Sequence, residues 1–402
     1  MVFIVALVIL AAAIAVVELG AFPLLRRRRT VIVGGVAALV AANVVTHAIA
    51  SGWRVGVEVN AFLGIVLVAL GTAALPVGVL VTLSWAVGRL SARVPGTKDG
   101  VSRAPGGSAG VATETGGAGN APPTISRRQV VEATGGAVIL GGTGSMLGWG
   151  AWRGRYDFQL EEVPVRIPGL PRALDGYVIA QVSDIHAGLH VGDRTIDDGL
   201  ALVRRARADL LVATGDLVDY MAEYAPLIAR KLADAAPRDG VVVVPGNHDH
   251  YAGVAQVREA MRAAGVTVLV NENLIVRPHD GGFALAGVDD LSGRRESSTF
   301  RGPDLDSALV GVPDHLPRIL LSHQPQTVDL WAGRVALQLS GHTHGGQINP
   351  GIRPADLVFR YVAGMYSVRG TSLYVNRGFG TVGPPARVGA PPEVTRFVLV
   401  AA

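Results

Sequence analysis

Five short apolar segments in the second half of the chain each end in polar residues, and this pattern most constrains the fold. The segments are residues 177–182, 210–213, 241–244, 318–321 and 335–339. Apolar runs of this length, bounded by Gly, Asp and Asn, are typical of buried strands. Stretches with helical spacing lie between them, so the sequence predicts an α/β fold with parallel strands. The predicted helices are residues 194–207, 220–235 and 254–264, and later strands are predicted at 283–286, 372–376 and 395–401.

The residues that follow the five segments are of types that bind metal ions. They are Ser183-Asp184-Ile185-His186, Gly215-Asp216-Leu217-Val218-Asp219, Gly246-Asn247-His248-Asp249, Ser322-His323 and Gly341-His342-Thr343-His344. In open α/β sheets ligands bind beyond the carboxyl ends of the strands, so five such ends can converge on one site. We expect the glycines before Asp216, Asn247 and His342 to allow tight turns that point side chains at this site.

The ligand types indicate the chemistry of the site. Carboxylate, imidazole and amide oxygen together suit Mn, Fe or Zn. Two such ions, about 3.5–4 Å apart, can clamp a phosphoryl group and activate a water molecule. The residues therefore predict a two-metal hydrolase. Because the chain has no cysteine, thiolate metal sites and cysteine nucleophiles are excluded.

The motif series resembles the calcineurin-like metallophosphoesterase superfamily. Its motifs run Asp-x-His, Gly-Asp, Gly-Asn-His-Asp/Glu, a lone His and Gly-His-x-His, and all are present here in that order over residues 172–402. The resemblance implies a β-sandwich flanked by helices on both sides, a four-layer α/β/β/α arrangement. The segments 341–347 and 376–380, with Arg387 and residues 391–393, are similar to the bacterial membrane-anchored, YkuE-like branch.

The resemblance also implies a role for each motif residue. It assigns seven residues to two divalent metal ions: Asp184, His186 and His344 to the first, Asn247, His323 and His342 to the second, and Asp216 to both. His248 would protonate the leaving oxygen or stabilise the transition state. Asp249 would orient His248, as carboxylates do for imidazoles in metal sites. The implied nucleophile is a hydroxide that bridges the metals, so no covalent enzyme intermediate is expected.

Three polar residues outside these roles have two interpretations each. Asp219 hydrogen-bonds a ligand or caps a loop. Arg377 and Arg387 bind a substrate phosphate, as arginine does with two parallel hydrogen bonds, or pair with a structural carboxylate.

The first part of the chain has the composition of a membrane region. Hydrophobic residues make up 49% of the chain and charged residues 17%, against about 25% charged in a soluble protein. Within residues 1–88, the apolar segments 2–25, 31–50 and 61–87 predict three transmembrane helices. Three buried helices of a soluble domain are the alternative, but such helices should show a polar face. Residues 89–125, rich in Gly, Ala, Pro, Ser and Thr, are predicted to be a flexible linker.

Residues 126–152 connect this region to the metallophosphoesterase domain, residues 153–402. Ser126-Arg127-Arg128 before an apolar stretch resembles a twin-arginine export signal. The stretch is predicted to be a fourth transmembrane helix, a cleaved signal, or both. Because Arg26–Arg29 should stay cytoplasmic, a fourth crossing would place the domain outside the cytoplasm.

We therefore expect a multi-pass membrane protein whose extracytoplasmic domain hydrolyses phosphate mono- or diesters. A lipid-linked or cell-envelope phosphate is the substrate that this location favours. The alternative is a non-catalytic metal- or phosphate-binding envelope protein that keeps the same fold. Nucleic acid is not an expected partner, because the formal net charge is only +4 and much of the basic charge lies beside apolar segments.

Overall fold

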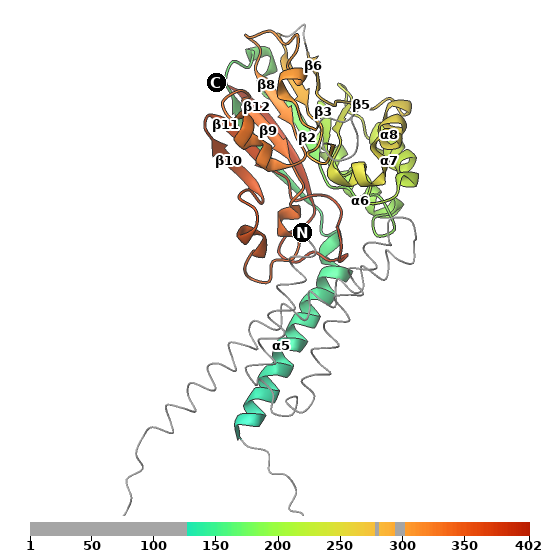
Figure 1. Ribbon diagram of the computed structural model, residues 1–402, viewed down its shortest axis with the longest axis vertical. Coiled ribbons are helices and arrows are strands. Elements are labelled where there is room, and N and C mark those ends of the chain that lie inside the picture. The colour runs from blue at the N-terminus through green and yellow to red at the C-terminus, as the bar shows by residue number, and fades with distance from the viewer. Residues whose placement is uncertain (1–126, 278–280, 294–301) are drawn as a thin grey trace, which may run out of the picture. The chain divides into compact units, whose positions relative to one another are not determined.

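The computed structural model describes residues 127–402 except 278–280 and 294–301, and its core is a pair of stacked β-sheets (Figure 1). One six-stranded sheet has the order β1 (Gln159–Ile167), β12 (Glu393–Ala401), β2 (Val178–Val182), β3 (Leu210–Thr214), β4 (Val241–Val244) and β5 (Thr267–Val268). The other has the order β10 (Gly364–Val368), β11 (Thr371–Val375), β9 (Leu337–Ser340), β8 (Arg318–Leu321), β7 (Phe283–Gly287) and β6 (Glu272–Val276).

The side chains on the two faces of a central strand pack in different hydrophobic cores, because successive side chains of a strand point to opposite sides. In β3, Leu210 and Val212 pack between the sheets against residues such as Phe283 of β7. Leu211 and Ala213 of the same strand pack on the opposite face, under the helices. This double burial explains why the central strands are continuous apolar runs in the sequence.

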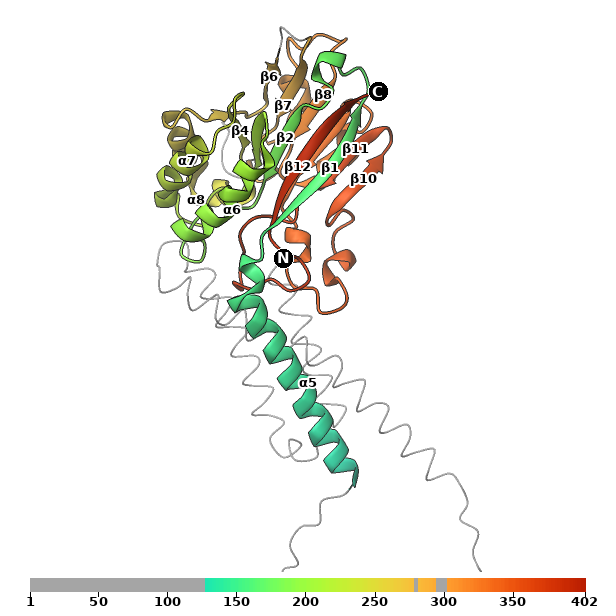
Figure 2. The same cartoon turned by 180° about the vertical axis from the view of Figure 1, so that it is seen from behind.

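Helices cover the outer face of both sheets. α6 (Asp193–Ala206), α7 (Ala225–Asp234) and α8 (Asn247–Ala263) lie together on the sheet that contains β2, β3 and β4 (Figures 1 and 2). The short helices α10 (Leu305–Ala308) and α11 (Val328–Trp331) pack on the other sheet. Short 3₁₀ turns complete the structure: η2 (Gly154–Tyr156), η3 (Arg172–Leu174), η4 (Ala222–Tyr224), η6 (Pro325–Thr327), η7 (His344–Gly346) and η8 (Pro354–Leu357). The predicted four-layer α/β/β/α arrangement is therefore confirmed.

Most sheet neighbours are parallel, as predicted, but some are not. β2, β3, β4 and β5 are mutually parallel, and so are β7, β8, β9 and β11. β12, in contrast, pairs antiparallel to β2, and β6 and β10 are antiparallel edge strands. β1, which pairs parallel to β12, was not predicted. As an edge strand it mixes charged with apolar residues and contains Pro164, which a central strand would not tolerate.

Residues 127–152 form one helix, α5 (Arg127–Trp152). Among the residues that the structure describes, no helix is both long and apolar enough to cross a membrane. α5 has the length, but seven of its residues are glycine and Glu132 is charged, which lowers its hydropathy. The predicted fourth transmembrane helix is therefore not supported. The three predicted spans and the linker lie outside the described residues.

The carboxyl end of α5 is attached to the folded domain through Gly150. Its carbonyl oxygen accepts a hydrogen bond of 3.1 Å from the backbone N–H of Arg387. A Cβ atom on Gly150 would lie 2.7 Å from a methyl carbon of Val388, so only glycine allows this close approach. The helix end and the loop at Arg387 are thus held together.

Candidate metal centre

Both sheets contribute to one group of polar side chains. Asp184 and His186 follow β2, Asp216 follows β3, and Asn247 begins the helix after β4. From the other sheet, His323 follows β8, and His342 and His344 follow β9. The structure therefore brings together all seven residues predicted to bind metal, and all are buried except the half-buried His342.

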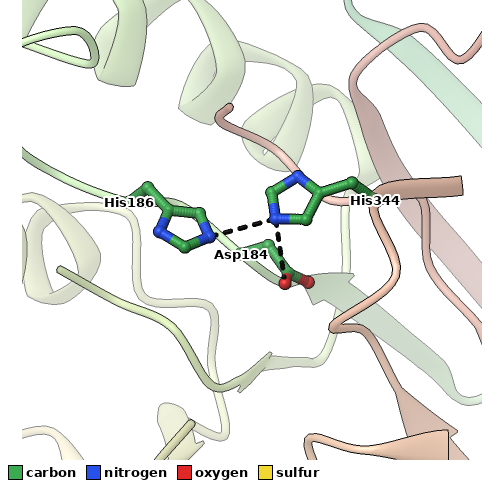
Figure 3. Close-up of side chains that lie close together, drawn as sticks. All are labelled: Asp184, His186 and His344. Carbon is green, nitrogen blue, oxygen red and sulfur yellow. Dashed lines mark hydrogen bonds and ion pairs between the residues drawn. The ribbon is translucent and has the colours of Figure 1, made fainter. Parts of the chain in front are cut away.

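The first predicted ligand group is compact (Figure 3). The Nε2 atoms of His186 and His344 lie 3.0 Å apart, and Nε2 of His344 lies 3.4 Å from Oδ1 of Asp184. Both Asp184 oxygens also accept the backbone N–H of His342 at 2.9 Å. This hydrogen bonding holds the carboxylate in place between the two motifs.

The second group surrounds His323. Its Nε2 atom lies 3.2 Å from Oδ2 of Asp216, 3.1 Å from Oδ1 of Asn247 and 3.2 Å from Nδ1 of His342. The other ring nitrogen, Nδ1, lies 2.7 Å from the carbonyl oxygen of Thr214. A carbonyl can only accept, so Nδ1 carries a proton, and once Nε2 loses its proton its lone pair faces the site and is available to a metal ion.

Asp216 lies between the two groups. Its Oδ2 atom is 3.6 Å from Nε2 of His186 in the first group and 3.2 Å from His323 in the second. Its Oδ1 atom accepts the backbone N–H of His248 at 2.7 Å. Buried imidazole nitrogens converge here with carboxylate and amide oxygens, a donor set suited to first-row divalent ions. The residues present therefore fit two divalent metal ions, and Asp216 lies where it could contact both.

The backbone of these residues is unusual. Five of the seven have a positive φ, a conformation that non-glycine residues rarely adopt: Asp184 (52°), His186 (50°), Asp216 (52°), His342 (74°) and His344 (53°). Strained residues of this kind persist only where their surroundings hold them, and they cluster at functional sites. Sequence patterns carry no sign of this strain, because all five residues have ordinary side chains.

The preceding glycines act differently from the prediction. Only Gly215 has a positive φ, at 90°. Gly246, with φ −114°, is needed because a Cβ atom there would lie closer than 3.0 Å to the backbone and carboxylate of Asp216. A Cβ atom on Gly341 would collide with Ser183 and Asp184 in the same way. Two of the three glycines therefore permit close packing rather than a left-handed turn.

His248 is oriented by Asp219, not by Asp249. Its Nδ1 atom lies 3.0 Å from Oδ1 of Asp219, which is also 3.5 Å from Nδ1 of His186. The carboxylate of Asp249 instead accepts three backbone N–H groups, those of Gly246, Leu217 and Val218. The predicted contact between Asp249 and His248 is therefore wrong. Asp249 instead links the Gly246–Asp249 motif to the backbone that follows Asp216. Adjacency in sequence suggested Asp249, but the first turn of α8 directs it toward the backbone.

The charges of the site shift the ionisation of its groups in the metal-free protein. Burial alone would raise the pKa of Asp216, but His323 and His248 outweigh it and hold that pKa well below its usual range. Burial alone would lower the pKa of His248, but Asp216 and Asp219 raise it to about 8. Burial and the neighbouring His323 lower the pKa of His342 to about 4, which favours its neutral, metal-binding form.

The two arginines have structural partners. Arg377 Nε lies 2.7 Å from Oε2 of Glu393, and its Nη2 lies 2.6 Å from Oε1 of Glu161. Arg387 is 1% exposed and donates to the carbonyl oxygens of Gly380, Arg377 and Ala390. Arg377 therefore follows the structural interpretation, as a pair with carboxylates. Arg387 follows neither interpretation, because its partners are backbone carbonyls and His344.

Aromatic side chains that the sequence analysis did not single out border the centre. The ring of His248 lies 4.7 Å from that of Tyr220 and 5.4 Å from that of Tyr251. The ring of Phe359 lies 6.1 Å from that of His342. Tyr251 is 53% exposed, so this border reaches the surface. No motif marks these residues, because they come from three separate loops and helices.

Comparisons with known proteins agree with this geometry. Residues 177–346 match the model of the family described as calcineurin-like phosphoesterase. The "uncharacterized metallophosphoesterase YkuE" of Bacillus subtilis is 34% identical over 294 residues, which cover 68% of this chain and 98% of that protein. The chain belongs to the calcineurin-like phosphoesterase family, as its motif series predicted.

Other similarities are more partial. The bovine "transmembrane protein with metallophosphoesterase domain" is 37% identical over 258 residues, which cover 60% of this chain and 56% of that protein. The chain thus spans little more than half the length of this relative. Among solved structures, TT1561 of Thermus thermophilus aligns with 14% identity and a TM-score of 0.36, over 50% of this chain and 90% of that chain. At this identity and TM-score, the alignment supports no conclusion about this chain.

Proposed function

We propose that this protein hydrolyses phosphate esters at the metal centre. The observation that carries the proposal is the position of Asp216 between two groups of buried metal-binding side chains. Two divalent ions, when bound there, would supply Lewis-acid stabilisation to a phosphoryl group. The ligands for the first are Asp184, His186 and His344, and those for the second are Asn247, His323 and His342, with Asp216 shared.

His248 is the proposed proton donor. Its Nδ1 atom is engaged by Asp219, which leaves Nε2 of the charged ring free to protonate the leaving oxygen of the ester. The carboxylates of Asp216 and Asp219 together favour the charged ring, and Asp219 fixes its orientation. These residues perform the acid step on either a monoester or a diester.

The second part of the proposal is membrane attachment through residues 2–87. It is supported by the three apolar segments in the sequence and by the name of the vertebrate relatives, "transmembrane protein with metallophosphoesterase domain". Attachment would confine the centre near lipid-linked or cell-envelope phosphates. The twin-arginine pattern favours a domain outside the cytoplasm.

Ester hydrolysis by the full-length chain in detergent tests the catalytic proposal. The chain is treated with chelator, and Mn, Fe, Zn or Mg is added back with p-nitrophenyl phosphate or bis-p-nitrophenyl phosphate as substrate. We expect metal-dependent turnover, and a loss of more than about 100-fold in Asp216→Asn, because this change removes the negative charge and replaces one of the two carboxylate oxygens by an amide nitrogen that does not bind metal. The exposed Asp198 on α6 provides the matched control, Asp198→Asn, which should retain activity.

Two results would redirect this proposal. If the chain binds two metals but cleaves neither ester, lipid phosphates are the next substrates to assay. If chelation and metal addition change nothing and no metal binds, the protein is a binding protein with this fold rather than a hydrolase.

The absence of cysteine makes the orientation in the membrane testable. Val310 is 74% exposed, and Val310→Cys introduces a single thiol into the chain. A membrane-impermeant maleimide should label this thiol in intact cells if the domain is extracytoplasmic. Labelling only after cell lysis would refute that orientation.

A further inference from the structure

The loop between the Gly-His-Thr-His motif and β10 exposes three large apolar side chains. Ile352 is 66% exposed, Leu357 is 89% exposed and Val358 is 62% exposed. Leu357 is the most exposed large apolar side chain in the part of the chain that the structure describes. Grouped exposure of this kind marks an interaction surface, whereas single exposed apolar residues need no explanation.

Hydrogen bonds at both ends of the loop hold these side chains in their exposed positions. At its start, the N–H of Asn349 donates to the carbonyl of Val388 at 2.8 Å, and the Asn349 amide donates to Gly345 at 3.0 Å. At its end, the N–H groups of Val358 and Phe359 both donate to Ala355. The apolar side chains therefore protrude from an ordered turn.

The loop borders the metal centre at one end. Phe359, directly after Val358, places its ring 6.1 Å from the ring of His342, a predicted metal ligand. A surface that receives Leu357 and Val358 would therefore lie next to the centre.

The end of α5 is joined to the same structure and carries exposed tryptophans. Trp149 is 49% exposed and Trp152 is 82% exposed. The segment Arg387–Val388 bonds Gly150 of this helix on one side and Asn349 of the loop on the other. Tryptophan is enriched where protein meets the interface of a bilayer, because its ring is apolar and its N–H can remain hydrated.

Charges around the loop are balanced. Arg353 pairs with Asp356 at 2.8 Å, and Arg360 lies 3.5 Å from Asp329. Electrostatic attraction to a strongly charged partner would therefore be weak, and the apolar side chains provide the main driving force. Protruding apolar side chains accompanied by tryptophan suit insertion into lipid better than a flat protein interface.

We propose that residues 352–358, the docking loop, insert into the surface of a lipid bilayer and hold the metal centre against it. This inference deepens the proposed function, on which its catalytic part rests, because it makes phosphate esters carried by lipids the substrate class. Insertion itself is independent of catalysis and can be measured separately.

Site-specific fluorescence on the full-length chain tests insertion. The chain has no cysteine, so Leu357→Cys can be labelled with the polarity-sensitive dye NBD at one position. The labelled protein is reconstituted in phosphatidylcholine–phosphatidylglycerol vesicles with and without doxyl-labelled lipid. Val310→Cys, 74% exposed on another part of the domain, is the matched control. We expect blue-shifted, doxyl-quenched emission at position 357 and water-like emission at position 310.

Other outcomes overturn the inference. Water-like, unquenched emission at 357 in vesicles would show that the loop does not insert. A blue shift that appears without vesicles and grows with protein concentration would show that a second copy of the chain covers the loop.

A second variant separates docking from catalysis. Leu357→Asp should lower the ratio of phosphatidic acid hydrolysis in vesicles to p-nitrophenyl phosphate hydrolysis by about tenfold or more, since burying a leucine is worth roughly this factor. An unchanged ratio would contradict the role of the loop in substrate access. If the wild-type chain cleaves neither compound, the hydrolase proposal fails, whereas the fluorescence result still decides insertion.

Discussion

The guanidinium group of Arg387 lies 3.2 Å from Nδ1 of His344, whose other ring nitrogen, Nε2, lies 3.0 Å from Nε2 of His186. Arg387 is nearly fully buried, and its N–H groups also satisfy backbone carbonyls of Gly380, Arg377 and Ala390. One side chain thus supports a predicted metal ligand and the loop that holds the end of α5. Arg387 is a positioning residue, because it acts through His344.

Replacing this arginine should weaken both the fold and the metal centre. Arg387→Met leaves buried carbonyls without donors, so we expect the free energy of unfolding to fall by about 3 kcal/mol or more in urea denaturation. Manganese affinity, measured by calorimetry, should fall about 10- to 100-fold. The exposed Arg205 offers the control Arg205→Met. Equal effects of the two substitutions would show that Arg387 has no special role.

Gly246 should tolerate no larger residue, because there is no space for a side chain at this position. In Gly246→Ala the new methyl group would collide with Asp216, so the carboxylate shared by the two ligand groups must move. We expect a loss of metal-dependent turnover of about 100-fold or more. Gly192→Ala is the matched control, because a Cβ atom there has no neighbour within 4 Å and Gly192 also precedes a helix. Retained turnover in Gly246→Ala would contradict the packing described here.

A proton donor should matter most when the leaving group is poor. His248→Gln should slow hydrolysis of an alkyl phosphate by about 10²- to 10⁴-fold. p-Nitrophenolate leaves readily without a proton, so the loss with p-nitrophenyl phosphate should be clearly smaller. Comparison of kcat for the two substrates tests the role directly. Equal losses with both would assign His248 to binding or to metal positioning instead.

The Asp219–His248 pair predicts a pH dependence in the metal-free protein. The pKa of His248 is raised to about 8, so the pair contributes its full stabilisation below about pH 6.5, the unfolded value. That contribution is lost as the pH rises through about 8. Asp219→Asn should therefore lower the free energy of unfolding by about 1 kcal/mol more at pH 6 than at pH 9, measured with chelator present. A pH-independent effect would contradict the ion pair.

Much of the fold was predictable because local apolar patterns in the sequence indicate its strands. β4 and β8 were predicted with the bounds observed, since β4 is a continuous apolar run and β8 is three buried apolar residues after Arg318. The seven metal-binding candidates were predictable because each follows such a run at the carboxyl end of a strand. Their convergence in the structure results from the parallel order of the two sheets.

The remainder depends on contacts that sequence spacing does not reveal. β1 and β12 come from opposite ends of the domain, so their pairing has no local signal. Asp219 and Asp249 both lie close in sequence to motif residues, and only the direction of each backbone decides which one meets His248. The apolar stretch in α5 suggested a membrane span, but its glycines lower the hydropathy below that of a span.

The central claim is that two metal ions share Asp216, and anomalous diffraction from crystals grown with Mn²⁺ tests it most directly. We expect two anomalous peaks about 3.5–4 Å apart. One should lie beside Asp184 and His186, the other beside Asn247 and His323, and both should contact Asp216. A single peak, or two peaks of which only one touches Asp216, would contradict the proposed centre.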